Sequence, residues 1–273
     1  MTTGSPRSSD SSKTPKYFDL ITNGVGRLHR VREVPVRRGP PTLACGIKGL
    51  HGIRGSASTV PYDLNVVGHD AKDFVRVNAN AANDIRQDVL VKFTVGDSRI
   101  HTFPLDGGGE GTLLKGRLLR CERFAPSPEI SEYALITRGI GYLNFIRNGD
   151  DDDSLVCGIN ALVGREDEVA KVPFDVNVVD EGMTTLIREY LPYVKDRHDV
   201  LVGFTLRGAQ IHSFPRSEDH PQELGYAVRS QLSALSFVTV DGKRVYNASR
   251  PVNESSETPS ESMNVPTADS CAA

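Results

Sequence analysis

The chain has 273 residues, of which 38% are hydrophobic and 25% charged, with a formal net charge of −3. This composition is typical of a globular protein, and no apolar run approaches the roughly 18 to 20 residues that span a bilayer. The first sixteen residues lack the apolar segment of a signal peptide. We therefore expect a cytoplasmic protein without membrane contact.

One segment, DVLVKFTVGDSRIHTFP at 88–104, recurs almost unchanged as DVLVGFTLRGAQIHSFP at 199–215. Three more blocks recur in the same order: LITNGVGRL and LITRGIGYL, LACGIKGLHG and LVCGINALVG, VPYDLNVV and VPFDVNVV. The period of roughly 110 residues is too long for a solenoid repeat and close to the size of a small domain. We interpret the chain as an internal duplication.

The duplication predicts how the chain is divided. The expected parts are a disordered tail at 1–16, domains at 17–124 and 133–246, a linker at 125–132 and a disordered tail at 247–273.

The first domain begins with a glycine-interrupted strand at 23–34, followed by a loop that contains Arg37 and Arg38. Apolar and polar residues then alternate in LACGIKGL and in VPYDLNVV, which predicts two half-buried strands. In the second of these, the residues expected to face inward are Val60, Tyr62, Leu64 and Val66.

A helix is predicted next, capped by Asp70, because four apolar residues follow at helical spacing. These residues are Phe74, Val77, Ala81 and Ile85. In the second domain Asp180 has the corresponding capping position. A fourth strand, VLVKFTV, and a fifth, TLLKGRLLRCERF, complete the domain.

Three strands, a helix and two strands in about 110 residues are typical of the OB-fold, a five-stranded Greek-key barrel. We therefore predict a mainly β protein with two tandem OB-fold-like five-stranded barrels, each with one helix between strands 3 and 4. A split β-grasp or an SH3-like domain is the alternative at this level.

Cysteine usage indicates neither a metal site nor a disulfide framework. Cys45 and Cys157 occupy equivalent positions in apolar strands, where a small buried side chain is expected. The sequence has no C-x-x-C motif and no Cys/His cluster with metal spacing. No spacing favours a catalytic triad or a P-loop either. We expect no metal, no cofactor and no enzymatic activity.

The two domains differ in charge. Residues 17–124 contain 16 basic and 11 acidic residues, whereas 133–246 contain 12 basic and 17 acidic residues. Only the first domain has the excess of basic over acidic residues that is expected for contact with a polyanion.

Binding of a single strand requires cations along the phosphates and flat side chains for the bases. The candidate cations of the first domain lie on its first strand and following loop, and on the second and fifth strands, which we expect to flank the first. They are Arg27, Arg30, Arg32, Arg37, Arg38, Lys48, Lys115 and Arg117. They form either a nucleic-acid track or an ordinary solvated face.

Alternation in RIHTFP puts His101 and Phe103 on one side of their strand, and His212 and Phe214 repeat the pair. Each pair is either an outward platform for stacked bases or a cluster packed under the following loop. Tyr142 and Phe145 stand in the second domain where the first has Arg27 and Arg30. This exchange fits a dimer interface at least as well as a DNA surface.

The succession of NGVGRLHRV, LACGIKGL, VPYDLNVVG, a helix and DVLVKFTVG resembles the bacterial single-stranded DNA-binding proteins. The stretches YFDL, GVGRLHRVREV and LACGIKGLHG more closely resemble an uncharacterised replication-protein family of integrative conjugative elements (ICEs) and plasmids. Two features depart from the single-stranded DNA-binding proteins. The chain has no Trp, and it ends in DSCAA instead of an acidic segment with an apolar tip.

The sequence thus predicts a protein that binds single-stranded DNA, or RNA, in the replication or transfer of a mobile element. The resemblance implies a homodimer with four OB domains and partners among replication or conjugation proteins. The alternative is an OB-fold scaffold module of such a complex that does not bind nucleic acid.

Overall fold

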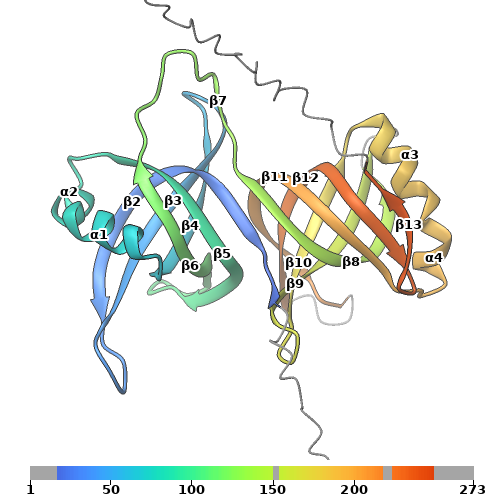
Figure 1. Ribbon diagram of the computed structural model, residues 1–273, viewed down its shortest axis with the longest axis horizontal. Coiled ribbons are helices and arrows are strands. Elements are labelled where there is room, and N and C mark those ends of the chain that lie inside the picture. The colour runs from blue at the N-terminus through green and yellow to red at the C-terminus, as the bar shows by residue number, and fades with distance from the viewer. Residues whose placement is uncertain (1–16, 150–153, 218–222, 249–273) are drawn as a thin grey trace, which may run out of the picture.

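A computed structural model describes residues 17–149, 154–217 and 223–248. The predicted tails lie almost entirely outside these residues. The chain forms two five-stranded barrels side by side, with their helices at opposite outer ends of the molecule (Figure 1). No helix in the described ranges is long and apolar enough to cross a membrane.

The first barrel follows the predicted order of three strands, a helical segment and two strands. Its elements are β2 (Ile21–Val34), β3 (Thr42–Ile53), β4 (Ser58–Val66), α1 (His69–Val77), α2 (Ala79–Asn83), β5 (Val89–Pro104) and β6 (Glu110–Arg123). Antiparallel pairs join β2 to β3 and β5, β3 to β4, and β5 to β6. Parallel pairing of β4 with β6 closes the barrel. The OB-fold topology is therefore confirmed.

The second barrel repeats this arrangement and adds one strand. Its elements are β8 (Ile136–Asn148), β9 (Leu155–Arg165), β10 (Ala170–Val178), α3 (Glu181–Glu189), α4 (Leu191–Lys195), β11 (Val200–Pro215), β12 (Leu224–Val240) and β13 (Lys243–Asn247). Parallel pairing of β10 with β12 closes it. The added strand β13 pairs with β12 and ends at Asn247, inside the region predicted as a tail.

Strand burial agrees with the predicted alternation, since Val60, Tyr62, Leu64 and Val66 are at most 3% exposed. Cys45 and Cys157 are also buried as predicted, and burial raises the pKa of each thiol to about 12.

One predicted pair of neighbouring strands in the first barrel was wrong. The strand that flanks the first strand on its second side is the fourth, β5, and not the fifth.

The helix prediction for the first domain was wrong in two respects. The chain turns at Asn78, whose side-chain amide donates to the carbonyl of Phe74, so that one predicted helix becomes the pair α1 and α2. Val77 and Ile85 are therefore exposed. The N-cap is Gly68, with Asp70 in the first turn, whereas Asp180 caps α3 as predicted by accepting from the Met183 amide.

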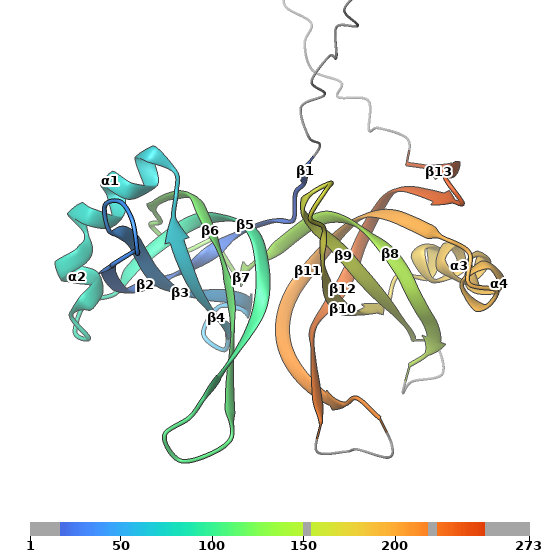
Figure 2. The ribbon, with the colours of Figure 1, turned by 90° about the horizontal axis from the view of Figure 1, so that it is seen from below.

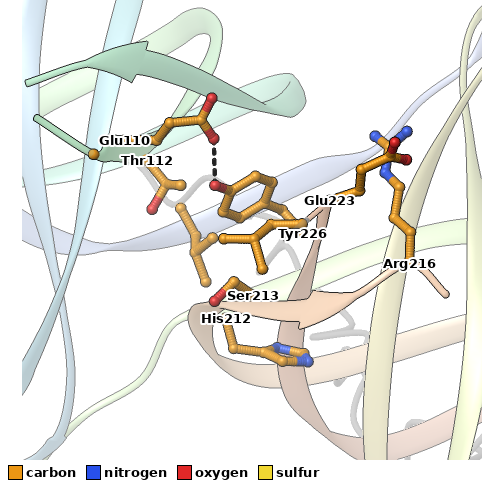
Figure 3. Close-up of a pocket in the computed structure, with 10 residues that line it drawn as sticks. Glu110, Thr112, His212, Ser213, Arg216, Glu223 and Tyr226 are labelled. Carbon is orange, nitrogen blue, oxygen red and sulfur yellow. Dashed lines mark hydrogen bonds between the residues drawn. The ribbon is translucent and has the colours of Figure 1, made fainter. Parts of the chain in front are cut away.

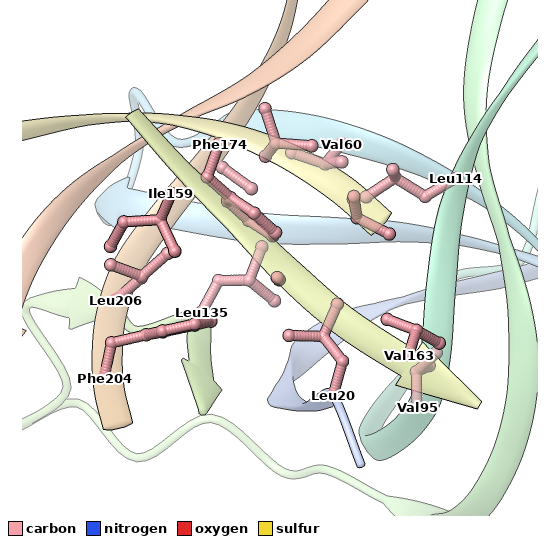
Figure 4. Packing of buried hydrophobic residues seen from close by; sticks show 14 of the residues in the cluster. Leu20, Val60, Val95, Leu114, Leu135, Ile159, Val163, Phe174, Phe204 and Leu206 are labelled. Atoms are coloured by element: carbon pink, nitrogen blue, oxygen red, sulfur yellow. The ribbon is translucent and has the colours of Figure 1, made fainter. Parts of the chain in front are cut away.

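The two barrels exchange short strands in a nearly symmetric way. The strand β1 (Tyr17–Phe18) pairs with the end of β9 in the second barrel, and β7 (Glu132–Tyr133) pairs with the end of β3 in the first. Between them, β2 pairs with the first residues of β8. The fully buried side chains of Leu20 and Leu135 lie in the shared hydrophobic core (Figure 4).

A buried hydroxyl pair lies at the centre of this interface, where Thr22 and Thr137 are cross-strand partners with their Oγ1 atoms 3.0 Å apart. We expect Thr22→Val to lower the free energy of unfolding by about 1–3 kcal/mol, because it leaves the Thr137 hydroxyl buried without a partner. The double Thr22→Val/Thr137→Val variant should recover part of this loss. Urea denaturation of the two single variants and the double variant measures the coupling, and strictly additive losses would contradict the prediction.

Candidate nucleic-acid interface

Strand register places the cations of the first barrel on one outer surface. Arg27 lies directly opposite Lys48 on β3, and Lys115 on β6 lies opposite both Asp63 on β4 and Arg99 on β5. Residues directly opposite each other point to the same side of a sheet. We call the resulting surface the basic face; its cations are Arg27, Arg30, Arg32, Lys48, Arg99, Lys115 and Arg117.

At one end of the basic face, Arg27, Arg30 and Lys48 line a hollow of about 470 Å³ beside the end of α2. The Nη1 atom of Arg27 lies 3.3 Å from Oδ1 of Asp88, and both side chains are more than half exposed. An exposed pair of this kind contributes little to stability. Arg27 can therefore exchange Asp88 for a phosphate at small cost.

At the other end, Arg32, Arg99, Lys115 and Arg117 line a hollow of about 520 Å³. Two of these cations are held by acids: Nη2 of Arg32 lies 2.6 Å from Oδ1 of Asp63, and Arg117 pairs with Asp97. For Arg99 and Lys115, no carboxylate lies within ion-pair distance among the described residues. These two side chains are therefore available to an incoming anion.

His29 lines the first of these hollows, beside Arg27 and Arg30. Its ring covers Gly46, where a Cβ atom would lie 2.5 Å from the ring, so the glycine provides the space that the ring occupies. Burial, followed by the charges of Lys48 and Arg30, lowers the pKa of His29. Both effects disfavour the protonated imidazole, and burial is the larger of the two.

The remaining predicted cations, Arg37 and Arg38, lie in the exposed loop between β2 and β3. Arg99 was absent from the sequence-based prediction. A register shift between Gly96 and Arg99 decides which side of β5 Arg99 faces, and regular alternation does not reveal such a shift.

His101 and Phe103 continue along β5 beyond Arg99, on the same side of the strand. Both side chains are half-buried, and Phe103 lies across Gly111 on β6, where a Cβ atom would come within 2.5 Å of its ring. The pair thus packs within its own hairpin and still extends the line of the basic face. A base-stacking role for it stays a prediction.

The corresponding pair in the second barrel is arranged differently. Phe214 covers Gly225 and is 39% exposed, but the side chain of His212 is only 17% exposed. Its Nε2 atom lies 2.8 Å from Oδ2 of Asp175, the counterpart of Asp63. Asp175 on β10 thus covers much of the His212 ring, and a base-stacking role for His212 stays a prediction.

Tyr142 and Phe145 do not form a pair on the surface. A bulge between Leu143 and Phe145 shifts the register, and Phe145 consequently covers Gly158 as His29 covers Gly46. Its structural counterpart is thus His29 and not Arg30. Arg147 lies over the Phe145 ring at 5.9 Å. Tyr142 lines a separate hollow of about 640 Å³ in the second barrel.

The β5–β6 and β11–β12 hairpins extend to the same side of the molecule (Figure 2). A hollow of about 660 Å³ lies between them, and the Tyr226 hydroxyl donates to Oε2 of Glu110 across it at 2.5 Å (Figure 3). This hydrogen bond raises the pKa of Tyr226. The contact joins the two hairpins and has no counterpart in the sequence-based prediction, since Glu110 and Tyr226 belong to different barrels.

Comparison with known proteins gives one family and several distant structures. The model of a family described as "Protein of unknown function (DUF3577)" matches twice, over residues 11–124 and 126–254. No curated protein matches.

Two solved structures with similarity are both single-stranded DNA-binding proteins from Thermus aquaticus, a deletion mutant and the wild type. The deletion mutant is 12% identical, with 87% of this chain and 98% of that chain covered and a TM-score of 0.43. The wild type is 12% identical, with 86% and 95% covered and a TM-score of 0.39.

Proposed function

This chain belongs to the DUF3577 family, and we propose that it binds single-stranded DNA through the basic face of its first barrel. The observation that carries the proposal is the gathering of seven cations from four strands on one outer surface. Acids are fewer there, namely Asp84 and Asp88 in one hollow and Asp63 and Asp97 in the other. The function is one of binding, without catalysis.

The arrangement favours a single strand over a duplex. Cations follow the curved outer surface of the barrel, as a phosphate backbone would, and His101 with Phe103 continues the same line toward the hairpin tip. Stacking on such side chains requires bases that are not paired inside a duplex. RNA fits the same chemistry.

Three finer points of the proposal rest on the sequence alone. They are action in the cytoplasm on a mobile element, cooperation with replication or conjugation proteins, and pairing of two chains into a homodimer. A protein-interaction role without nucleic acid is the second candidate. It is favoured by Val77 at the end of α1 and Ile85 just beyond α2, which are 84% and 100% exposed.

The test is a fluorescence-anisotropy titration of a labelled oligo-dT of some thirty nucleotides against a duplex of equal length, repeated at several salt concentrations. We expect preference for the single strand and a linear fall of log K with log salt, with a slope of about −0.7 per phosphate engaged. Absence of binding to either nucleic acid at low salt would refute the proposal and favour the protein-interaction role.

A further inference from the structure

The second barrel carries a cluster of cations that its net charge conceals. Lys171 on β10, Lys195 at the end of α4 and Arg197 just beyond α4 line the hollow of about 640 Å³ that also contains Tyr142. Asp199 is the single acid among its lining residues. We call this the second hollow.

The second hollow occupies the same place in its barrel as the hollow lined by Arg27, Arg30 and Lys48 in the first, which we call the Arg27 hollow. Tyr142 lies opposite Asn160 across β8 and β9, as Arg27 lies opposite Lys48 across β2 and β3. Each hollow also extends to the acid just before the fourth strand, Asp199 in one barrel and Asp88 in the other. The cations in this place therefore come from different elements in the two barrels.

Arg197 has a backbone conformation that normally favours glycine. Its φ is +62°, and it follows the C-cap Asp196 of α4, where the His198 amide donates to the Tyr193 carbonyl at 2.9 Å. Glycine is usual at this position of a helix end. An arginine here is strained because its Cβ atom crowds the following carbonyl oxygen, and such strain is concentrated at functional sites.

The first barrel shows the same feature. Arg30 lines the Arg27 hollow and has a φ of +51°. In both barrels, an arginine thus occupies a left-handed position beside the corresponding hollow.

The turn that carries Arg197 is fixed from two sides. Nδ1 of His198 lies 2.7 Å from Oδ2 of Asp241, and the Asp199 amide donates to Oδ1 of the same carboxylate at 3.0 Å. The ring of Tyr193 contacts the His198 ring edge-on at 5.8 Å between centroids. These contacts hold the Arg197 backbone in place without using its guanidinium group.

We propose that the second hollow is a second single-strand site, in which Lys171, Lys195 and Arg197 bind phosphates and Tyr142 contacts a base. This inference rests on the proposed function and extends it to the second barrel, which has more acidic than basic residues. The helix pairs beside the two hollows lie at opposite ends of the molecule (Figure 1). A short oligonucleotide therefore reaches only one of the two sites, and each chain binds two short strands.

The test counts binding sites with a labelled oligo-dT of about ten nucleotides at low salt, in the wild type and in Arg197→Gly. Glycine adopts a positive φ without strain, so we expect Arg197→Gly to unfold at the same or a higher temperature. We also expect the weaker of its two sites, the second hollow, to lose about tenfold in affinity for the oligonucleotide. Lys171→Gln/Lys195→Gln should reduce the stoichiometry from two to one.

Arg188→Gln is the matched control, because Arg188 is an exposed cation on α3 outside the lining of the second hollow. It should leave both sites unchanged. Two sites that persist with unaltered affinity in Arg197→Gly and in Lys171→Gln/Lys195→Gln would overturn the inference, as would a single site in the wild type. Absence of any binding by the wild type would instead refute the proposed function.

Discussion

Replacement of Lys48 and Lys115 together by Glu is expected to lower the affinity for oligo-dT at low salt by about a hundredfold or more. Both side chains are exposed, and neither has an ion-pair partner in the part of the chain that the structure describes. Neither substitution removes a member of the Arg27–Asp88 or Arg32–Asp63 pair. It removes two phosphate contacts and adds two repulsive charges.

Salt dependence separates this local effect from a change in overall charge. Loss of two phosphate contacts should make the slope of log K against log salt shallower by about 1.4. The control is Arg76→Glu/Arg188→Glu, which makes the same change of charge at exposed helix positions outside the basic face. Equal losses of affinity in the two double variants would show that the basic face has no specific role.

The substitution Gly68→Ala is expected to destabilise the protein by about 3 kcal/mol. A Cβ atom at Gly68 would lie 1.9 Å from the carbonyl oxygen of Leu119, which is part of the backbone and cannot rotate away. The Leu118 carbonyl also accepts hydrogen bonds from the amides of Val67 and Gly68. Relief of the clash would thus pull β4 and α1 away from β6.

The matched control is Gly107→Ala, because a Cβ atom there would meet nothing within 4 Å and its φ is not positive. We expect its free energy of unfolding to stay within about 0.5 kcal/mol of the wild type. Urea denaturation of both variants provides the comparison. A Gly68→Ala protein as stable as Gly107→Ala would mean that the approach of Leu119 to Gly68 is not as close as described.

Much of the fold follows from local pattern. The period-2 alternation of VPYDLNVV and VLVKFTV requires one buried face, and the element order predicts how five strands close into a barrel. The helix was mistaken in detail because the spacing from Phe74 to Ile85 continues smoothly past Asn78. The change of direction there depends on a side-chain bond to the backbone, which spacing alone does not indicate.

The candidate site was less predictable because partners come from distant parts of the chain. Alternation gives the side of the strand on which His212 lies, but it does not show that Asp175 reaches its ring. The side of β5 that Arg99 faces depends on a bulge, and the cations of the second hollow come from β10, from α4 and from the turn after α4. A count of charges over a whole domain does not reveal such a local cluster of cations, although the residues themselves are visible in the sequence.

The most direct test of the basic face is photo-crosslinking of a bromodeoxyuridine-substituted oligo-dT, followed by mass spectrometry of the crosslinked peptides. The account predicts crosslinks in the first barrel on peptides from β2–β3 and the β5–β6 hairpin, which carry Lys48, His101, Phe103 and Lys115. Their yield should fall in Lys48→Glu/Lys115→Glu. Crosslinks confined to α1, α2 or α3, or an unchanged yield in that variant, would contradict the account.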